Sequence, residues 1–279
     1  MRKLSFIFAL LPLVAISCNK DMGTSVSSEP KEIVLALEGE GITAEVETKT
    51  SAVTSLSSAY YAATTGSAGS DETSKWGSTS ATVSSNKIST GKYQTASPTS
   101  YNWYISNCSM TFGKTGSTIS PDGASIDAVA GYTAASNSTS PSVTLDHVFA
   151  RTGSLSISAT NGYTISGVSY KLKSKGTNTG TKGTYNIYSK VWSSTTTLSD
   201  QTITSSSDLY LIPGTYTLTV SGTESLGDFS HTFSASTDIT LVAGKTNNIA
   251  VKRTGVGATQ IVVSTTLTAW GSNSISANI

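Results

Sequence analysis

The sequence predicts an all-β protein made of two tandem β-sandwich domains, and three observations lead to this class. Only 37% of the 279 residues are hydrophobic and 13% are charged. Serine and threonine together supply about a third of the chain; threonine, with valine and tyrosine, favours strands, whereas serine and glycine favour turns. Many short segments alternate apolar and polar residues, the period of half-buried strands. After the first twenty residues, no window longer than a turn or two has apolar residues at helical spacing.

Residues 1–17 have the pattern of a secretory signal peptide. Arg2 and Lys3 give a positive start, an apolar run extends from Phe6 to Ile16, and small residues precede Cys18. The apolar run is too short to cross a bilayer as a stop-transfer helix. A cysteine at this position resembles the bacterial lipobox, in which the thiol is acylated, with palmitate as an expected acyl chain, and becomes the mature N-terminus. We therefore expect lipidation at Cys18; the alternative is an ordinary signal peptide followed by an incidental cysteine.

The next segments predict a tether and then a first domain over residues 32–150. Residues 18–31 are polar and serine-rich, which is typical of a flexible linker, here carrying the lipid. Apolar residues alternate in two strand candidates, Ile33–Leu37 and Ile42–Val46. Residues 51–91 are mostly small and polar, with short strand candidates at Ala59–Ala63 and Ala81–Ser84. The core of this half must therefore depend on aromatic side chains. These are Tyr60, Tyr61, Trp76, Tyr93, Tyr101, Trp103, Tyr104 and Phe112.

Residues 141–159 mark the expected boundary between the two domains. Val143 and Leu145 alternate with polar residues on one side, and Leu155 and Ile157 do so on the other, which predicts two strands with a break at Ala150–Gly153. We expect the second domain over residues 151–279. Its strand candidates are Thr164–Leu172, Gly183–Val191, Ser207–Ile212, Gly214–Ser221, Phe229–Ala235, Thr237–Val242, Asn247–Lys252 and Ile261–Leu267, with turns that include Gly222–Gly227. Their steady spacing indicates a sandwich, and the lack of a fixed repeat disfavours a solenoid or propeller.

The charge pattern argues against a nucleic-acid partner. The formal net charge is +1 with both signs mixed along the chain, whereas nucleic-acid binding needs a concentrated positive surface. Lys171, Lys173 and Lys175 form a small basic cluster on one face of a predicted strand, and we interpret it as a solvated face that also discourages strand pairing.

A search for catalytic, cofactor or metal residues predicts none. His147 and His231 each lie in an alternating strand with no cysteine or carboxylate at ligand spacing, which favours a structural or surface role. No G-x-S-x-G elbow is present. Asp122 and Asp127 lack the alternating oxygen ligands of a calcium loop. Cys108 lies among aromatic residues, where we expect a buried, inert thiol. We therefore expect a protein that is not an enzyme and that binds no cofactor.

A series of short segments carries a family resemblance. Besides the lipobox at Cys18, the segments are ETKTSAVTS, TSYNWYI, IDAVAGYTA, VTLDHVFARTGSLSI, GTKGTYNIYSKVW, DLYLIPGTYTLTVSGT, ITLVAGKTNNIAV and IVVSTTLTAW. In this order they resemble the fimbrillin-like proteins of Bacteroidetes, the subunits of type V pili and their relatives, over nearly the whole mature chain. The resemblance implies two sandwiches of transthyretin-like topology and export as a lipoprotein to the outer membrane.

The resemblance also implies assembly by strand exchange. In the polymerising members, a trypsin-like protease cuts after a basic residue behind the first strands and frees a groove for a neighbour's donor strand. In this sequence the shed strands would be Ile33–Leu37 and Ile42–Val46. The cut would follow Lys49 and leave Thr50 as the new N-terminus. The donor would be Ile261–Leu267 together with the tail after Trp270.

One departure from the family pattern keeps an alternative open. The best-known processing enzymes of the family cut after arginine, but no arginine lies between Arg2 and Arg151. Cleavage at Arg151 would separate the two domains instead of opening a groove. A form that keeps its lipid, as an anchor or accessory subunit, is therefore the alternative to processing at Lys49.

The sequence thus predicts a structural or adhesive subunit of a surface fimbria at the outer membrane. Its expected partners are other pilin subunits, bound by donor-strand exchange, and the membrane, through the lipid on Cys18. A second hypothesis is a monomeric surface lipoprotein that binds host or bacterial glycans or proteins through exposed aromatic residues such as Trp76, Trp103 or Tyr104. A third is a hydrolase whose paired carboxylates meet only in space.

Overall fold

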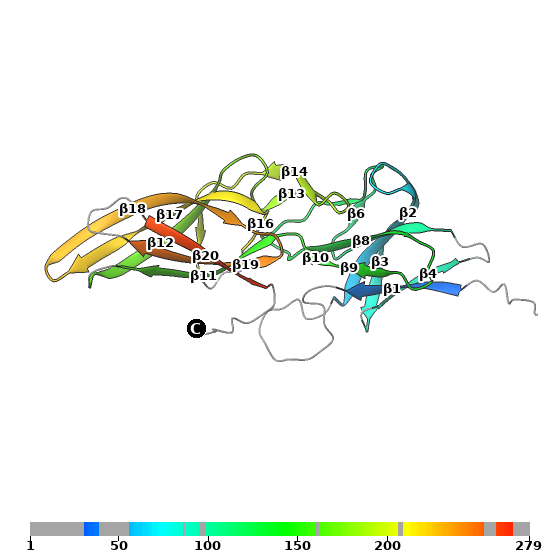
Figure 1. Cartoon of the computed structure of the whole chain (residues 1–279), viewed down its shortest axis with the longest axis horizontal. Helices are drawn as coiled ribbons and strands as arrows, with labels where there is room; N and C mark the ends of the chain where they lie inside the picture. Colours follow the sequence, from blue (N-terminus) through cyan, green and yellow to red (C-terminus); the bar gives the residue numbers. More distant parts are fainter. Residues whose placement is uncertain are drawn as a thin grey trace, which may run out of the picture.

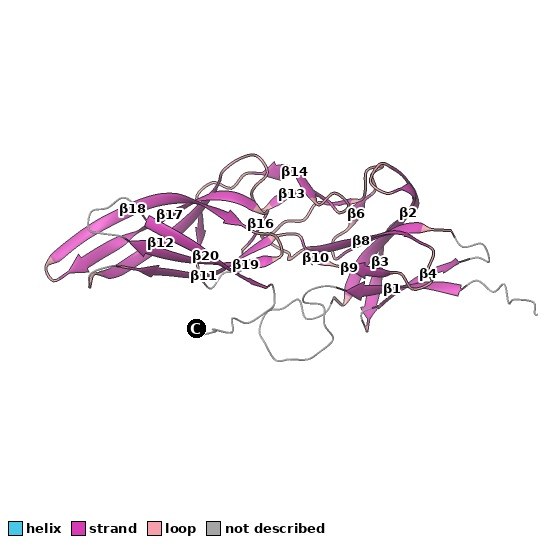
Figure 2. Cartoon of the chain, in the orientation of Figure 1, coloured by secondary structure: helices cyan, strands magenta, loops and turns pink. Residues whose placement is uncertain are grey.

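The computed structural model describes residues 31–38, 56–85, 87–94, 99–159, 162–205, 209–253 and 261–269. These residues form strands, turns and loops, and among them there is no helix long and apolar enough to cross a membrane. Strands run through the whole length of an elongated molecule (Figure 2). The predicted all-β class is confirmed. The division into two sandwich domains and their transthyretin-like topology stay predictions.

The N-terminal half, before residue 150, contains one eight-stranded sheet with the order β10-β8-β5-β2-β3-β4-β1-β9. Its strands are β1 (Lys31–Glu38), β2 (Ser58–Ser67), β3 (Asp71–Ser84), β4 (Lys87–Gln94), β5 (Tyr101–Ser106), β8 (Val129–Ser136), β9 (Ser142–Thr144) and β10 (Asp146–His147). β3 pairs with β2 along most of its length but with β4 only at Val83 and Ser84. β9, at one end of the strand order, also contacts β8 and β5, so that the sheet encloses a core.

Aromatic side chains fill much of this core, as the sequence predicts. The ring centroids of Trp76 and Trp103 lie 5.6 Å apart, and those of Trp76 and Tyr101 lie 4.9 Å apart. Two of the expected core residues are instead on the surface, because Tyr93 is 54% exposed and Phe112 is 40% exposed.

The C-terminal half contains two four-stranded sheets, with the orders β16-β11-β19-β20 and β15-β12-β17-β18. Their strands are β11 (Ala150–Ser158), β12 (Thr164–Ser174), β15 (Gln201–Ile203), β16 (Tyr210–Leu211), β17 (Gly214–Leu226), β18 (Phe229–Leu241), β19 (Lys245–Arg253) and β20 (Ile261–Ala269). Buried residues from both sheets, such as Leu218 in β17 and Ile249 in β19, form one core.

A fourth sheet joins the two halves (Figure 1). Its order is β14-β13-β7-β6, with β6 (Met110–Thr111), β7 (Thr118–Ile119), β13 (Lys182–Asn186) and β14 (Val191–Thr196). Tyr185 of β13 pairs with Ile119 of β7, so the ladder connects chain on both sides of residue 150. A core that includes Tyr104, Phe149 and Trp192 lies beside this sheet. The halves therefore share both hydrogen bonds and buried apolar surface.

The expected break at Ala150–Gly153 is wrong, because these residues begin β11. Ala150 pairs with Leu211 and Arg151 with Thr246, so the backbone is paired on both sides. The ladder shifts register between Thr152 and Leu155, close to Gly153. The break lies instead between β10 and β11, where Phe149 is buried in the shared core.

The expected turn at Gly222–Gly227 is also wrong. β17 and β18 form a continuous antiparallel ladder from Gly214 opposite Leu241 to Leu226 opposite Phe229. The strands connect through Gly227 and Asp228, a two-residue hairpin that needs a positive φ, and Gly227 has φ +56°. Between Val220 and Leu226 the stretch has no apolar side chain, so its composition is typical of a turn although the ladder with β18 continues through it. At Gly183–Val191 the sequence predicts one strand, and this prediction is wrong. The segment contains the end of β13, a turn and the start of β14.

A buried ion pair bridges the two sheets of the C-terminal half. Nε of Arg253 in β19 donates to Glu224 Oε2 in β17 at 2.7 Å, and Nη2 donates to Oε1 at 2.9 Å. Both residues are almost fully buried. The guanidinium also lies 4.1 Å from the ring centroid of Phe233. This bidentate geometry compensates for moving two charges out of water.

Removing one partner of this pair should destabilise the fold strongly. We expect Arg253→Met to lower the free energy of unfolding by about 3–5 kcal/mol, because the Glu224 carboxylate stays buried without its cation. Replacing both partners, Arg253→Met with Glu224→Leu, should recover most of that loss. The control is Lys182→Met at the exposed Lys182–Asp122 pair, where we expect a change of about 1 kcal/mol or less. Urea unfolding measures all three variants, and equal effects of the two single variants would contradict the assignment.

Candidate assembly site

Strand β1 has neighbours on both sides in the sheet of the N-terminal half. It pairs antiparallel with β4, where Leu35 is opposite Ile88, and parallel with β9, where Leu37 is opposite Val143. The antiparallel ladder covers most of the strand, whereas the parallel ladder begins at Ala36. β1 therefore fills a gap between two strands that come later in the chain (Figure 1).

The described side chains of β1 are part of the N-terminal core. Ile33 and Leu35 have no exposed surface, and they belong to the same apolar cluster as Ile88 and Val143. The two residues are separated by one position, so they point to the same face of the strand, as the alternation predicts. Burial of such side chains contributes about 1.5–3 kcal/mol each relative to exposure.

Polar contacts fix the position of β1 along the groove. The Thr90 hydroxyl donates to the Ile33 carbonyl at 2.6 Å, and the Tyr61 hydroxyl donates to the Thr90 carbonyl at 2.7 Å. The Val34 amide donates to the Thr139 carbonyl at 2.9 Å. If β1 were absent, two strand edges and an apolar floor would be exposed together. Such a groove suits an extended segment that supplies both a backbone ladder and alternate apolar side chains.

Strand β20, the predicted donor, has the opposite environment. It lies at the edge of its sheet and pairs only with β19 among the described strands, from Arg253 opposite Ile261 to Lys245 opposite Ala269. Ile261 and Val263 pack partly against the core, but Leu267 is 45% exposed. β20 thus has apolar residues at the alternate positions typical of a core strand, but Ile261 and Val263 are only partly buried and Leu267 is exposed.

The structure describes only part of the predicted assembly machinery. The predicted first strand, Ile33–Leu37, lies within β1. Cys18, Lys49, Thr50, the second strand candidate at Ile42–Val46 and the tail after Trp270 lie outside the described residues. Lipidation and proteolytic processing therefore stay predictions.

The predicted aromatic platform for glycans is wrong for two of its three residues. Trp103 and Tyr104 are fully buried, so neither presents a face to a ligand. Trp76 is half-buried. Its ring packs against the ring of Tyr101, and the Lys92 ammonium lies 5.9 Å from its centroid. Trp103 and Tyr104 therefore serve packing.

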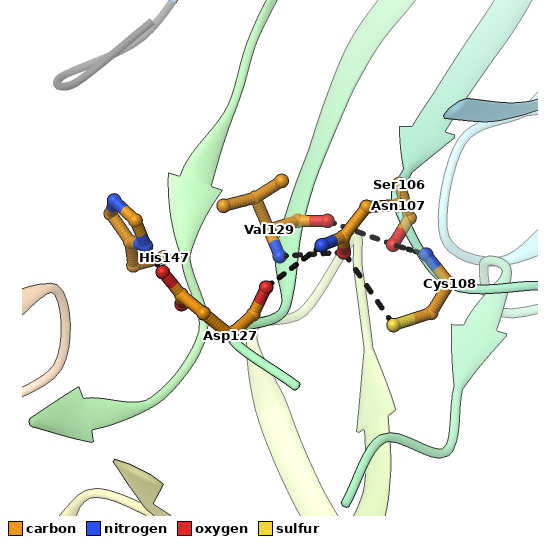
Figure 3. A network of polar contacts seen from close by, with 6 residues as sticks. All are labelled: Ser106, Asn107, Cys108, Asp127, Val129 and His147. Carbon is orange, nitrogen blue, oxygen red and sulfur yellow. Dashed lines mark hydrogen bonds and ion pairs between the residues drawn. The ribbon is translucent and has the colours of Figure 1, made fainter. Parts of the chain in front are cut away.

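A polar network near the junction of the halves includes a contact that the sequence did not predict. His147 Nδ1 lies 2.9 Å from Asp127 Oδ1, although the two residues are twenty positions apart. The Asn107 amide donates to the Asp127 carbonyl at 2.8 Å and accepts from the Val129 amide at 3.0 Å (Figure 3). The predicted structural role of His147 fits its burial and this carboxylate partner. No local spacing could have indicated the pair, because the contact depends on the pairing of β10 with β8.

This network does not have the chemistry of a nucleophilic site. Burial raises the pKa of the Cys108 thiol, and the nearby Asp127 adds to the shift, so the thiol stays protonated at neutral pH. The Asp127 carboxylate faces His147, and Cys108 lies on the side of Asn107 (Figure 3). Asp122, the other carboxylate considered for a calcium loop, pairs with Lys182 at 2.8 Å. Within the described residues, no three histidine, cysteine or acidic side chains come together as metal ligands would.

Comparison with known proteins places the fold. No protein-family model and no curated protein sequence matches the chain. Among solved structures, a fimbrial protein from Bacteroides vulgatus has a TM-score of 0.56 at 13% identity, covering 86% of this chain and 99% of that one. Proteins provisionally described as cell adhesion proteins give 0.53 at 10% identity (Parabacteroides distasonis, 87% and 100% covered) and 0.52 at 12% identity (Bacteroides uniformis, 88% and 99% covered). The chain therefore shares its fold with these proteins over nearly its full length, as the fimbrillin-like resemblance predicts.

The packing of β1 gives a stability prediction. We expect Leu35→Ala to lower the free energy of unfolding by about 2–5 kcal/mol, because it leaves a cavity in the N-terminal core. Leu267→Ala in β20 is the matched control, and we expect a change below about 1 kcal/mol there because the side chain is half exposed. Urea unfolding is the measurement. Similar effects of the two substitutions would contradict the central position of β1.

The raised pKa of Cys108 gives a second prediction. In the folded protein, iodoacetamide at mildly alkaline pH should alkylate Cys108 at least about tenfold more slowly than in concentrated urea, because only the thiolate reacts. Mass spectrometry of the Cys108 peptide measures both rates, with glutathione as the reference thiol. Fast alkylation of the folded protein would show that the thiol is reactive.

Proposed function

We propose that this chain, which shares its fold with solved fimbrial and cell adhesion proteins, is a structural or adhesive subunit of a surface pilus. The observation that carries the proposal is the position of β1. It fills a gap between β4 and β9 with buried Ile33 and Leu35, and it precedes every other described strand in the chain. A strand at the start of the chain can be removed by one proteolytic cut without breaking any later connection.

Assembly would proceed by exchange of one strand for another. A cut after Lys49 removes β1 and leaves Thr50 as the first residue of the subunit. The vacated groove then accepts β20 of a neighbouring copy, whose Ile261, Val263 and Leu267 have the alternation that Ile33 and Leu35 have in β1. The incoming strand restores about 1.5–3 kcal/mol for each apolar side chain that it buries.

Export would place the unprocessed subunit at the outer membrane. The signal-like residues 1–17 end before Cys18, so the lipidated cysteine would hold the chain at the cell surface through residues 18–31. A short apolar chain attached to a cysteine gives membrane affinity without a spanning segment. Cleavage after Lys49 would release the folded subunit from this anchor into the fimbria.

A second candidate is an anchor or accessory subunit that keeps β1 and its lipid. Two observations favour it over the processed, polymerising subunit. β1 has backbone partners in both β4 and β9, so its removal costs two sets of hydrogen bonds. The preferred basic residue, arginine, is missing between Arg2 and Arg151. This subunit would offer β20 to a neighbour while its own groove stays closed.

Analysis of the protein from its native cells separates the two candidates. We expect the wild-type protein to form polymer ladders that resist mild heating in detergent, with Thr50 as the N-terminal residue of each subunit. Lys49→Gln should abolish the ladders and leave a single band that begins with lipidated Cys18, whereas Lys171→Gln, an exposed lysine in β12, should change neither result.

Two other outcomes would decide against polymerisation through this cut. A wild-type protein that begins with Cys18 and runs as one band would favour the anchor subunit. Ladders of unchanged yield in Lys49→Gln would exclude Lys49 as the processing site.

A further inference from the structure

Strand β18 is the longest edge strand in the described part of the chain. It has 13 residues, and β17 is its one strand partner among the described strands. The other described edge strands are shorter: β20 has nine residues, β14 has six, and β6, β9, β10, β15 and β16 have two or three. Because hydrogen-bonded and non-bonded pairs alternate in an antiparallel ladder, every second residue of an edge strand directs its N–H and C=O outward. β18 therefore presents the longest row of outward backbone groups.

β18 lacks the features that usually keep an edge strand from pairing. Proteins protect such edges with lysine, proline, bulges or short strands. The sequence of β18, FSHTFSASTDITL, contains no lysine, arginine or proline, and Asp238 is its one acidic residue. The ladder with β17 runs without a register shift to the pair of Gly214 and Leu241, so no bulge turns the edge away. The edge of β18 is thus suited to pairing with another strand.

The polar side chains of β18 are directed toward β17 and not over the outer edge. The hydroxyl of Ser236 lies 2.8 Å from that of Thr219 in β17. The Thr217 hydroxyl donates to the Asp238 carboxylate at 3.0 Å, and the Lys175 ammonium also contacts this carboxylate. The charge of Asp238 is therefore balanced from the side of β17. These contacts leave the outer backbone groups of β18 uncovered by its own side chains.

Apolar side chains are exposed at both ends of β18. Phe229, its first residue, is 44% exposed, and Val242, the residue after its end, is 37% exposed. The ring centroids of Tyr163 and His231 lie 6.1 and 6.4 Å from that of Phe229, so an aromatic cluster forms at the closed end of the long hairpin (Figure 1). An identical strand in antiparallel orientation would bring the Phe229 end of one copy beside the Val242 end of the other. One pairing would then cover both apolar ends.

We propose that β18 is a self-association surface, at which two copies of this chain pair their β18 strands antiparallel across a twofold axis. Both edges are used in this contact, and the opposite edge of the sheet is the three-residue β15, so the assembly closes as a dimer. Asp238 lies three residues from Ala235 at the middle of the strand, which places the two carboxylates about 20 Å apart. This separation exceeds the Debye length of about 8 Å, so the charges do not oppose pairing. The contact involves neither β1 nor β20 and is therefore independent of strand exchange.

Sedimentation equilibrium of the unprocessed chain tests the self-association. We expect a reversible dimer, and we expect Ser234→Lys to raise its dissociation constant at least about tenfold, because the two copies would place ammonium groups close together at the axis. Ser166→Lys is the matched control and should dimerise as the wild type does. Ser166 is exposed on the same sheet, but it lies in β12, and β17 separates it from the edge. A wild type that stays monomeric at every concentration, or an equal dissociation constant for Ser234→Lys, would overturn the proposal.

Hydrogen exchange of the wild type locates the contact without any substitution. Alternate amides of β18 should exchange at least about tenfold more slowly in the dimer than in the diluted monomer, because their outward N–H groups gain a partner. The amides of β20, the edge strand of the other sheet, should exchange at the same rate in both samples. Far-ultraviolet circular dichroism verifies that the lysine variants are folded. A dimer that slows exchange in β20 and leaves β18 unchanged would show that the copies meet elsewhere, and would overturn the proposal.

Discussion

The burial of β1 between β4 and β9 is the interaction on which the N-terminal half depends. The two neighbouring strands are far from β1 in sequence, and they meet only through it in the sheet. Ile33 and Leu35 close the core from that side, while Thr90 and Thr139 hold the strand backbone. A single strand that completes both a hydrogen-bond ladder and a core has a large effect on stability. Because it is also the first described strand, no connection between the later described strands runs through it.

The junction of the two halves does not depend on a single strand, because several strands and a shared core form it. β7 and β13 pair across it, and Tyr104, Phe149 and Trp192 share one core. The turn between β18 and β19 is bonded to Phe149, and Lys190 of the turn after β13 reaches Asp146 of β10. These contacts make the orientation of the halves part of the folded structure.

The all-β class and most C-terminal strands could be predicted from the sequence, because alternation of apolar residues is a local signal. Strand candidates at Ile33–Leu37, Thr164–Leu172 and Asn247–Lys252 lie within β1, β12 and β19. The errors occur where local composition misleads, as in the serine- and glycine-rich stretch that forms most of β3 and the end of β17. In the candidate site, the apolar face of β1 was predictable. Its place between β4 and β9 and the Asp127–His147 contact were not, because each depends on strands that meet only in the folded chain.

The direction of the strands also determines how the molecule responds to a pulling force. In Figure 1, the long hairpin of β17 and β18 and strand β11 of the other sheet run close to the long axis of the molecule. Hydrogen bonds in an antiparallel ladder are perpendicular to the strands. A hairpin pulled at its two open ends breaks these bonds one after another. In the parallel pair of β11 and β19, by contrast, a force that enters at the start of β11 and leaves at the end of β19 loads the ladder in shear, so that many bonds must break together. Strands that help to build the core of the C-terminal half thus also resist a force applied between the start of β11 and the end of β19.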